Sequence, residues 1–600
     1  MIGDGLQVDA LELFKAEIRA EDLPVRIECV KHVDVIAHAL GKDNAISVLV
    51  PLISDCVKGI FCSDDDELLL SFAKNLPKLV PYLPVESGPT ALIGPLEFLA
   101  NQDETVIREA AVESLGKLSR ISKSVCDDAC YPALLRLFKG TLFEWCLHVF
   151  VAEWFSPKLS ACGLAHFVYP SVGAEARAQI RMLYIGCAND ETPMVKRAAA
   201  SHLHKLLPVM EKEFVISEVV PVYQMFATDD TQEAVRCSCV ASSVALCELL
   251  NESEINMHAR DTITALATDK SWRVRLAMAK VLGRLCQSLG RESMVSHLLA
   301  PMMAMMQDQE PDVRKAAVSS LHETAGLLSP EEVAVAIVPL FSVIGKDPVQ
   351  QVRSALSACI GPLAKTLGND FTLTHLLPLL MESIKDDYPT IRFNATGSIG
   401  SICEVLGNDP QYQSTITSLV SLMHTLSQDA NWRTRLAVLE QIPILCKLLG
   451  KEVFEQKLES LLLSFFGDSV HAIRAAVTQE IGKVVLLIGE EWAVNHFANK
   501  VLSLYSETNS YSSRIAILQT LPKLKAVMKN ADDVKRLLFP PLEKGCRDLV
   551  PNVRFVACEV IAEMFPKNLD ALRPSLDTLA TDVDIDVRYF AQRAVIEANK

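Results

Sequence analysis

The chain has 600 residues, half of them hydrophobic and only 6% aromatic, which suits packed helices better than a sheet protein. Its formal charge of −16 argues against binding to a phosphate backbone, so nucleic acid is not an expected partner. The most apolar window, residues 142–155, is too short for a membrane span, and the first residues show no signal or transit peptide. We therefore expect an all-α protein that is soluble, binds no membrane and works in the cytoplasm, with the nucleus as a second compartment.

A repeat of about 39 residues runs along the whole chain. Each copy has an anchor position, usually β-branched or apolar, that precedes Arg or Lys and a run of small residues. The fifteen anchors are Val25, Leu68, Ile107, Pro157, Val195, Val235, Val274, Val313, Val352, Ile391, Thr434, Ile473, Ser513, Val553 and Val587. A register held this long predicts fifteen copies of one structural unit.

Charged residues keep the same phase as the anchors. Five residues before the anchor stands an aspartate in Asp190, Asp230, Asp269, Asp308, Asp347, Asp386, Asp429, Asp468, Asp548 and Asp582. One residue after it stands an arginine in Arg26, Arg108, Arg236, Arg275, Arg314, Arg353, Arg392, Arg435, Arg474, Arg514, Arg554 and Arg588, with Lys158, Lys196 and Leu69 in the other copies. Residues that recur in nearly every copy serve the copy itself, so we expect them to cap the second helix and bridge the layers.

Residues 375–407 show how one copy folds. The leucines of LLPLL recur at helical spacing, and Pro378 inside this segment should bend the first helix. Asp386 marks a turn, and Pro389 fits the first position of a second helix, which Gly407 closes. Glycines close the second helix in other copies at Gly290, Gly368, Gly450 and Gly489. Each copy is predicted to be a helical hairpin.

A single hairpin cannot bury both of its amphipathic helices, so the hairpins must stack into an α-α superhelix, or solenoid. The turns that join first to second helices then lie along one edge, which we call the turn ridge. Two similar segments, DKSWRVRLA (269–277) and DANWRTRLA (429–437), place Trp272 and Trp432 on this ridge. The residues alone leave two interpretations open for each indole: it covers a neighbouring turn, or it binds a partner.

The phrase L-L-P-L followed by D-x-x-x-x-V-R-x-x-A, repeated with variations, resembles the HEAT-repeat family. Unit-specific phrases narrow the resemblance: AVESLGKLS, SACGL, DETPMVKRAAAS, DKSWRVR, DANWRTRLAVLE, NVRFVACEVI and DVDIDVRYFAQRA. Together they resemble the scaffold (A) subunits of protein phosphatase type 2A, over essentially the whole chain. That resemblance implies a horseshoe-shaped solenoid over residues 1–600, in which the repeated Asp pairs with the repeated Arg of an adjacent repeat.

The resemblance also implies partners and contact residues. A phosphatase catalytic subunit would bind repeats 11–15 (411–600), an exchangeable regulatory B-type subunit would bind repeats 1–8 (8–330), and repeats 9–10 (331–410) would lie between them, giving a heterodimer or heterotrimer. The implied contacts with the catalytic subunit are Trp432, Arg433, His471, Tyr511 and Val550. The implied contacts with regulatory subunits are Pro193, Met194, Arg197, Trp272 and Arg273.

Two departures from the family pattern stand out. His471 occupies a position where a tyrosine is usual, which puts that contact in doubt. About eleven extra residues precede the fourth anchor, within TLFEWCLHVFVAEWF. They are either a loop inserted on the ridge or an artefact of gene-model translation, and the artefact is favoured because an exposed run this apolar promotes aggregation.

Catalysis and metal binding have no visible residues to carry them. The chain lacks a phosphate-binding glycine loop, an H-E-x-x-H helix, a nucleophile elbow and any C-x-x-C pair, so neither cofactor nor metal is expected. The favoured function is a non-enzymatic scaffold. A nuclear-transport receptor is the first alternative, although the distinctive acidic loop is not seen. A HEAT-repeat metal hydroxylase fits poorly, because His322-Glu323 is the one adjacent His-Glu pair.

Overall fold

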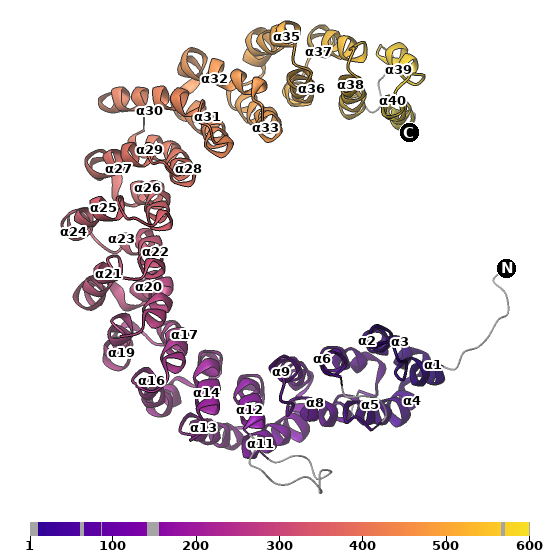
Figure 1. The fold of residues 1–600 in the computed structure, drawn as a ribbon, viewed down its shortest axis with the longest axis vertical. Coiled ribbons are helices and arrows are strands. Elements are labelled where there is room, and N and C mark those ends of the chain that lie inside the picture. Colours follow the sequence, from indigo (N-terminus) through magenta and orange to yellow (C-terminus); the bar gives the residue numbers. More distant parts are fainter. Residues whose placement is uncertain are drawn as a thin grey trace, which may run out of the picture. The chain divides into compact units, whose positions relative to one another are not determined.

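The computed structural model describes residues 10–60, 65–85, 87–140, 155–407, 409–565 and 571–598, and these residues form helices and turns without a strand. The all-α expectation is confirmed. The chain divides into two compact units, Met1–Met305 (unit 1) and Met306–Lys600 (unit 2). Within each unit, hairpins of two helices stack in chain order, so that the first helices form one layer and the second helices another (Figure 1).

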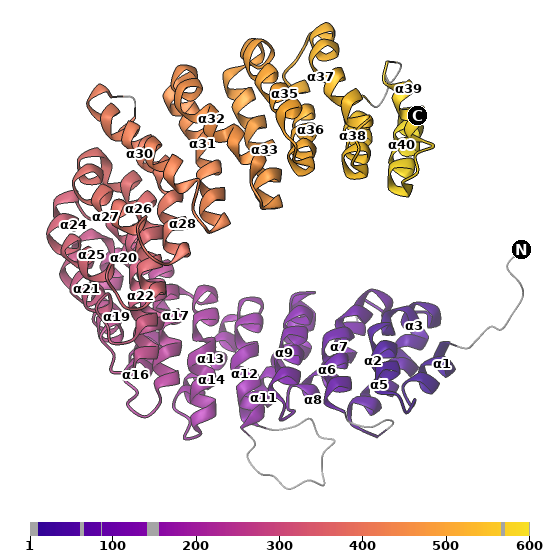
Figure 2. The same cartoon turned by 45° about the horizontal axis from the view of Figure 1, so that its top comes forward.

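Unit 1 holds the first seven hairpins and the first helix of the eighth. Its second helices, α2, α6, α9, α12, α14, α17 and α20, pack in succession, each on the next (Figure 2). Its helical segments are α1 (Ala10–Glu17), α2 (Leu23–Lys31), α3 (Val33–Leu40), α4 (Lys42–Asn44), η1 (Ala45–Leu49), α5 (Val50–Val57), α6 (Asp66–Asn75), η2 (Leu76–Tyr82), α7 (Gly88–Ala91), α8 (Ile93–Leu99), α9 (Thr105–Ser119), α10 (Lys123–Val125), η3 (Cys126–Cys130), α11 (Tyr131–Lys139), α12 (Ser156–Val168), η4 (Tyr169–Ser171), α13 (Ala174–Ala188), α14 (Pro193–Leu206), η5 (Leu207–Val209), α15 (Lys212–Phe214), η6 (Val215–Val219), α16 (Val220–Ala227), α17 (Glu233–Leu249), α18 (Glu252–His258), α19 (Arg260–Ala267), α20 (Trp272–Ser293), η7 (Met294–Leu298) and α21 (Leu299–Met305).

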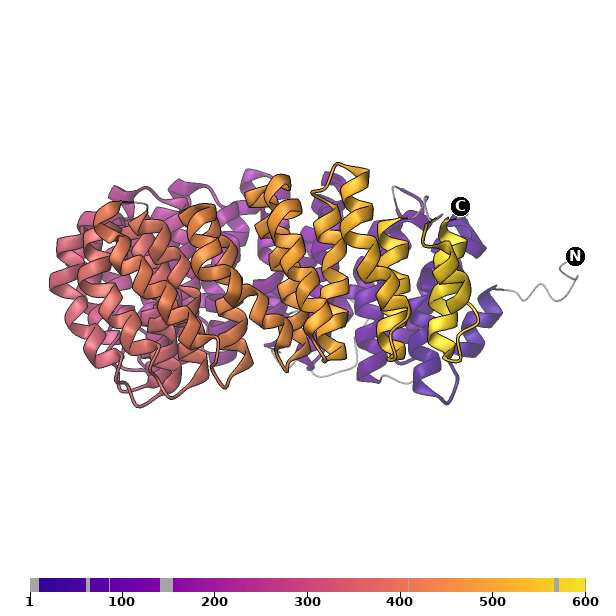
Figure 3. The ribbon, with the colours of Figure 1, turned by 90° about the horizontal axis from the view of Figure 1, so that it is seen from above.

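Unit 2 continues the same pattern. Its second helices stack from α22 through α26, α28, α31, α33, α36 and α38 to α40. The last helices of the unit, orange to yellow, stand side by side in Figure 3. Its helical segments are α22 (Pro311–Ser319), α23 (Leu321–Ala325), α24 (Pro330–Ala336), α25 (Val338–Ile344), α26 (Gln350–Phe371), η8 (Thr372–Leu376), α27 (Leu377–Ser383), α28 (Pro389–Gly397), α29 (Ile399–Leu406), η9 (Pro410–Tyr412), α30 (Gln413–Leu426), α31 (Trp432–Val453), η10 (Phe454–Leu458), α32 (Glu459–Ser464), η11 (Phe465–Gly467), α33 (His471–Ile488), α34 (Glu490–Trp492), η12 (Ala493–Phe497), α35 (Ala498–Glu507), α36 (Tyr511–Lys525), α37 (Ala531–Cys546), α38 (Pro551–Met564), α39 (Arg573–Leu579) and α40 (Ile585–Ala598).

The predicted anchors are core positions of the second helices. All fifteen lie in a second helix, and all except Val25, in the first hairpin, are buried. Even Thr434 and Ser513, the polar members of the set, are sealed from solvent. The 39-residue period therefore follows the spacing of one buried contact, which each hairpin makes with its neighbours.

Proline bends several first helices as predicted. In repeats six and ten, a π-helical turn, Val215–Val219 or Thr372–Leu376, leads into a helix that has Pro221 or Pro378 at its second position. Proline cannot donate the hydrogen bond of a regular helix, and the wider turn accommodates that loss. The bend is not universal, because α37 runs unbroken through Pro540 and Pro541.

Glycine ends the second helices, but not in the left-handed helical conformation common at helix ends. Gly450 has φ 79° and ψ 176°, an extended conformation with positive φ that is essentially restricted to glycine. The chain there passes directly into the first helix of the next repeat, so the range given for α31 covers the end of one helix, the kink at Gly450 and the start of the next helix. Gly290 and Gly368 adopt the same conformation within α20 and α26.

The extra apolar residues before the fourth anchor, 141–151, lie outside the described residues. The horseshoe shape of the whole chain and the boundaries of the two binding regions remain predictions.

Candidate functional site

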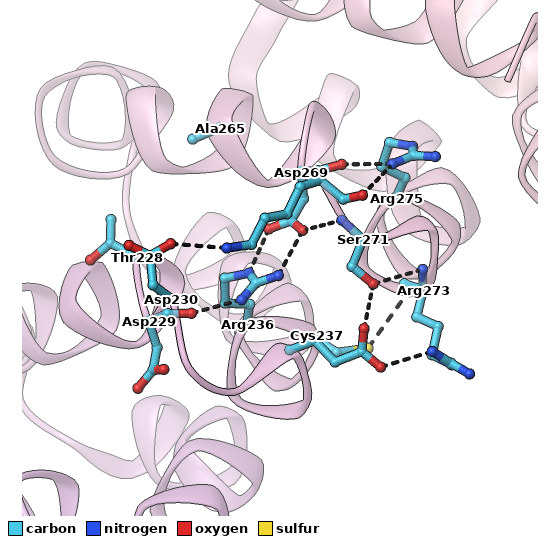
Figure 4. A network of polar contacts seen from close by, with 12 residues as sticks. Thr228, Asp229, Asp230, Arg236, Cys237, Ala265, Asp269, Ser271, Arg273 and Arg275 are labelled. Atoms are coloured by element: carbon cyan, nitrogen blue, oxygen red, sulfur yellow. Dashed lines mark hydrogen bonds and ion pairs between the residues drawn. The ribbon is translucent and has the colours of Figure 1, made fainter. Parts of the chain in front are cut away.

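A ladder of arginine and aspartate side chains runs under the turn ridge. In unit 1, Arg236 Nε and Nη2 donate to the two carboxylate oxygens of Asp269 at 2.7 and 3.0 Å (Figure 4). The third guanidinium nitrogen, Nη1, donates to the backbone carbonyl of Asp229 in its own repeat at 2.7 Å. One arginine thus joins the turn of its own repeat to the turn of the next, in a pair that we call a rung.

The same rung recurs, and the predicted pairing between adjacent repeats is confirmed. In unit 2 the Nε–Oδ2 distance is 2.7 or 2.8 Å in Arg314–Asp347, Arg353–Asp386, Arg392–Asp429, Arg435–Asp468, Arg514–Asp548 and Arg554–Asp582. In unit 1, lysines replace arginine in the pairs Lys158–Asp190 and Lys196–Asp229. Arg275 and Asp308 keep the local contacts of the ladder: Arg275 donates to the Asp269 carbonyl, and Asp308 accepts the Glu310 amide.

Two details of the prediction were wrong. The ladder aspartate does not cap the second helix: Asp386 accepts the amide of Tyr388, and Tyr388 is itself the residue that precedes the helix. The aspartate therefore closes a short turn before the helix begins. In the sixth repeat, Asp229 rather than Asp230 makes the rung, since that turn is one residue longer; Asp230 is exposed and pairs with Lys270.

The rungs hold the aspartates in the charged state. Burial alone would raise the pKa of Asp386, but hydrogen bonds from Arg353 and from the Tyr388 amide outweigh it and keep that pKa below its ordinary value. The same balance lowers the pKa of Asp269, Asp429 and Asp468. The ladder is a structural device, and it leaves the residues above it free to meet a partner.

Trp432 and Arg433 form a paired surface at the start of α31. Asn431 precedes the helix, and its side chain accepts the Arg433 amide at 2.9 Å. Trp432 is half-buried, and the exposed Arg433 guanidinium lies 4.6 Å from the centre of its ring. Within the described part of the chain, the Arg433 guanidinium has no acidic partner. An aromatic face and an unpaired cation are thus presented together.

The other residues expected to meet the catalytic subunit lie at equivalent places in their turns. His471 and Tyr511 are the exposed first residues of α33 and α36, and Val550 is the half-buried residue before α38. Sequence reasoning missed the neighbour of Val550: Leu549 is 95% exposed, and Val583 at the same point of the last turn is 94% exposed. The signal is an apolar residue directly after the ladder aspartate.

The regulatory-side residues lie in unit 1. Trp272 and Arg273 repeat the stacked pair, with the guanidinium 4.8 Å from the ring centre, but Arg273 also binds Glu233 at 2.9 Å. Pro193, Met194 and Arg197 are exposed on the first two turns of α14.

Met194 and Arg197 line a hollow of about 560 Å³ that extends over α9, α12, α14 and α17. Lys205 and His202 line it too. Burial lowers the pKa of His202 to about 4, so the positive charges that α14 contributes to the lining of this hollow are those of Arg197 and Lys205.

The described residues contain no cluster of His, Cys, Asp or Glu suited to a metal ion. None of the helices in the described ranges combines the length and the apolar character that crossing a membrane demands.

Comparison with known proteins assigns the repeats. A family model described as PPP2R1A-like HEAT repeat matches residues 291–368, and a HEAT repeat model matches residues 260–289 and 376–406. The chain is 35% identical over 208 residues to the protein phosphatase 2A scaffold subunit of Dictyostelium discoideum, covering 34% of this chain and 33% of that protein. It is 32% identical over 238 residues to a probable serine/threonine-protein phosphatase PP2A regulatory subunit of Caenorhabditis elegans, covering 40% and 37%.

The alignments therefore span less than half of these relatives. Their names describe scaffold and regulatory subunits, in agreement with the expectation of a non-enzymatic chain. Among solved structures, importin β aligns over 98% of this chain and 76% of its own with a TM-score of 0.61 and 12% identity, a likeness of fold alone. The chain thus carries HEAT repeats between residues 260 and 406, and it is similar in sequence to the scaffold (A) subunits of protein phosphatase 2A.

Proposed function

We propose that this chain is the non-catalytic scaffold of a serine/threonine protein phosphatase 2A heterotrimer. The turn ridge of unit 2, in repeats 11–15, binds the catalytic subunit, and the turn ridge of unit 1 binds an exchangeable regulatory subunit. Holding both on one chain raises the effective concentration of each at the other. The scaffold and regulatory names of the sequence relatives support this proposal.

The observation that carries the proposal is the stacked pair of Trp432 and Arg433. Trp and Arg are the residues most enriched at the energetic centres of protein interfaces. Here the ladder fixes the turn beneath them, and the Arg433 side chain has no carboxylate partner in the described residues. Exposed apolar side chains at Leu549, Val583 and Tyr511 extend the same ridge.

The test replaces both residues, Trp432→Ala with Arg433→Glu, and measures capture of purified phosphatase 2A catalytic subunit. Loss of the aromatic contact and reversal of the charge should weaken binding at least a hundredfold, since hot-spot truncations cost about 2 kcal/mol or more each. The thermal melt should change little, because the indole is only half-buried and the guanidinium is exposed.

Unit 1 offers the matched control. Trp272→Ala with Arg273→Glu alters the same two residue types in the same stacked geometry. This variant should keep the catalytic subunit but lose the regulatory subunit. Undiminished capture of the catalytic subunit by the Trp432 variant would refute the assignment of the unit 2 ridge, and a collapsed melt would mean that the indole serves the fold.

A further inference from the structure

One rung of the ladder in unit 2 is missing. Arg474, on α33, makes the usual contacts with its own turn, since Nη1 donates to the carbonyls of Asp468 and Ser469 at 2.6 and 2.9 Å. Within the described residues, its Nε and Nη2 atoms meet no carboxylate. These are the two atoms that bind the next aspartate in the rungs on either side, Arg435–Asp468 and Arg514–Asp548.

The cause is a single residue in the next turn. Thr508 stands where the other turns have the ladder aspartate, six residues before Arg514. Its hydroxyl accepts the amide of Ser510 at 3.2 Å, so it still closes the turn. A hydroxyl, however, lacks the two oxygens and the charge that a guanidinium binds side by side. The helices α33 and α36 pack together without this rung.

The free edge of Arg474 is held in place and open. The two carbonyl contacts orient the guanidinium as in its neighbours, so a partner need not pay the entropy of ordering it. The side chain is half-buried, but its Nε and Nη2 atoms are not enclosed by the protein. Both atoms therefore reach solvent. The nearest ladder carboxylates, Asp468 and Asp548, are already engaged by Arg435 and Arg514.

The surroundings favour a protein partner. Arg474 lies on the first turn of α33, which begins at the exposed His471, and α33 packs on α36, which begins at the exposed Tyr511. Both belong to the set proposed above to meet the catalytic subunit. A carboxylate side chain of a protein docked on these two turns would meet the Arg474 edge.

We infer that the catalytic subunit completes the missing rung in trans, with an Asp or Glu side chain bound by Nε and Nη2 of Arg474. This inference rests on the proposed function. It assigns Arg474 as a specificity-determining contact and Thr508 as the residue that keeps the contact vacant for the partner.

The decisive variant is Thr508→Asp, which supplies the carboxylate within the chain. The new aspartate should bind Arg474 as Asp548 binds Arg514 and raise the melting temperature. It should also weaken, by about tenfold, the binding of purified phosphatase 2A catalytic subunit, because it occupies the guanidinium that the partner's acid would bind. The matched control is Thr508→Asn. Asparagine has the shape of aspartate and still closes the turn, but it carries no charge, so this variant should bind the catalytic subunit within about twofold of wild type.

Arg474→Ala should weaken binding by a similar factor, and adding Thr508→Asp to it should cost little more, because both changes remove one contact. Binding would be measured by calorimetry or surface plasmon resonance at two salt concentrations, and the loss should be smaller at high salt.

The outcomes separate the two claims. If wild type fails to bind the catalytic subunit, the proposed function falls and this inference falls with it. If wild type binds and Thr508→Asp binds equally well, only the missing-rung contact is wrong. A lowered melting temperature for Thr508→Asp would also overturn the inference, because the aspartate would then not reach Arg474.

Discussion

Asp386 shows how much one ladder residue does. Its carboxylate binds Arg353 of the preceding repeat and the amide of Tyr388, while its carbonyl accepts Arg392 of its own repeat at 2.8 Å. One residue therefore closes a turn and, through Arg353 and Arg392, ties its repeat into the ladder on both sides. Its recurrence was visible in the sequence, and so was its structural character. Its exact contacts were not, because a period gives the phase of a residue and not the atoms that it meets.

We expect Asp386→Ala to lower the free energy of unfolding by about 2 kcal/mol, the usual cost of losing a hydrogen bond to a charged group when its partner is left behind. Arg353 would remain half-covered without an acid. The measurement is urea unfolding followed by far-ultraviolet circular dichroism. Asp387→Ala is the control: its side chain is exposed, and the change should stay within about 0.5 kcal/mol. Equal losses in both variants would show that the rung contributes nothing.

The contact residues were predicted less completely than the ladder. The tryptophans stood out because their flanking phrases are specific, whereas Leu549 was passed over although it is far more exposed than Val550. An apolar residue in a turn looks the same in sequence whether it points inward or outward. Only the ladder geometry shows that the residue after the aspartate faces solvent.

At the level of elements, helical hairpins, proline bends and terminal glycines all followed from local patterns. The conformation of the glycines did not. Gly450 ends its helix as predicted, but its ψ of 176° is extended and not left-handed helical, because the chain must pass straight into the next helix instead of turning back. The tight link between hairpins is a property of the stack, and a single hairpin's sequence does not contain it.

Gly450→Ala should therefore destabilise the protein by about 1 to 3 kcal/mol, although an added methyl group would meet no atom within 4 Å. The cost comes from backbone strain alone. Gly397→Ala is the counterpart: Gly397 also has open space, is the last residue of helix α28 without a positive φ, and its replacement should stabilise by about 0.4 to 1 kcal/mol. Chemical denaturation of both variants tests the pair; a neutral Gly450→Ala would mean that the link relaxes.

At the scale of the molecule, the period predicted the stacking of hairpins and their number. It did not predict the division into two units, because the step from Val274 to Val313 is an ordinary 39 residues and no linker marks Met305. Because the anchor spacing stays uniform across this boundary and no linker interrupts the repeats, the sequence pattern does not reveal where one packed unit ends and the next begins.

Acid should destabilise the protein in two stages. Burial lowers the pKa of His166 and His202 to about 4, below the value of about 6.5 in an unfolded chain, so their contribution is lost as pH falls from about 6.5 towards 4. The ladder aspartates have folded pKa values below the unfolded value of about 4, so their contribution is present above pH 4 and is lost below it. Urea midpoints from pH 7 to 3 test this.

The two stages belong to different residues. His202→Gln should reduce only the loss of stability between about pH 6.5 and 4. Asp386→Asn with Asp429→Asn should reduce the loss of stability below about pH 4. A first stage that is unchanged in the histidine variant would disprove its assignment.

The direction of the ladder has a consequence for how such a chain can change length. Hairpins such as the tenth and eleventh, in unit 2, each contribute one guanidinium that reaches forward and one carboxylate that is reached from behind. If a whole copy of this kind is removed or duplicated, the guanidinium of the preceding copy can pair with the carboxylate of the copy that now follows it. Neither group is left without a partner. Gain or loss of whole repeats therefore preserves the ion pairs of the ladder, whereas an insertion that splits a repeat would leave an arginine or an aspartate without its ion-pair partner.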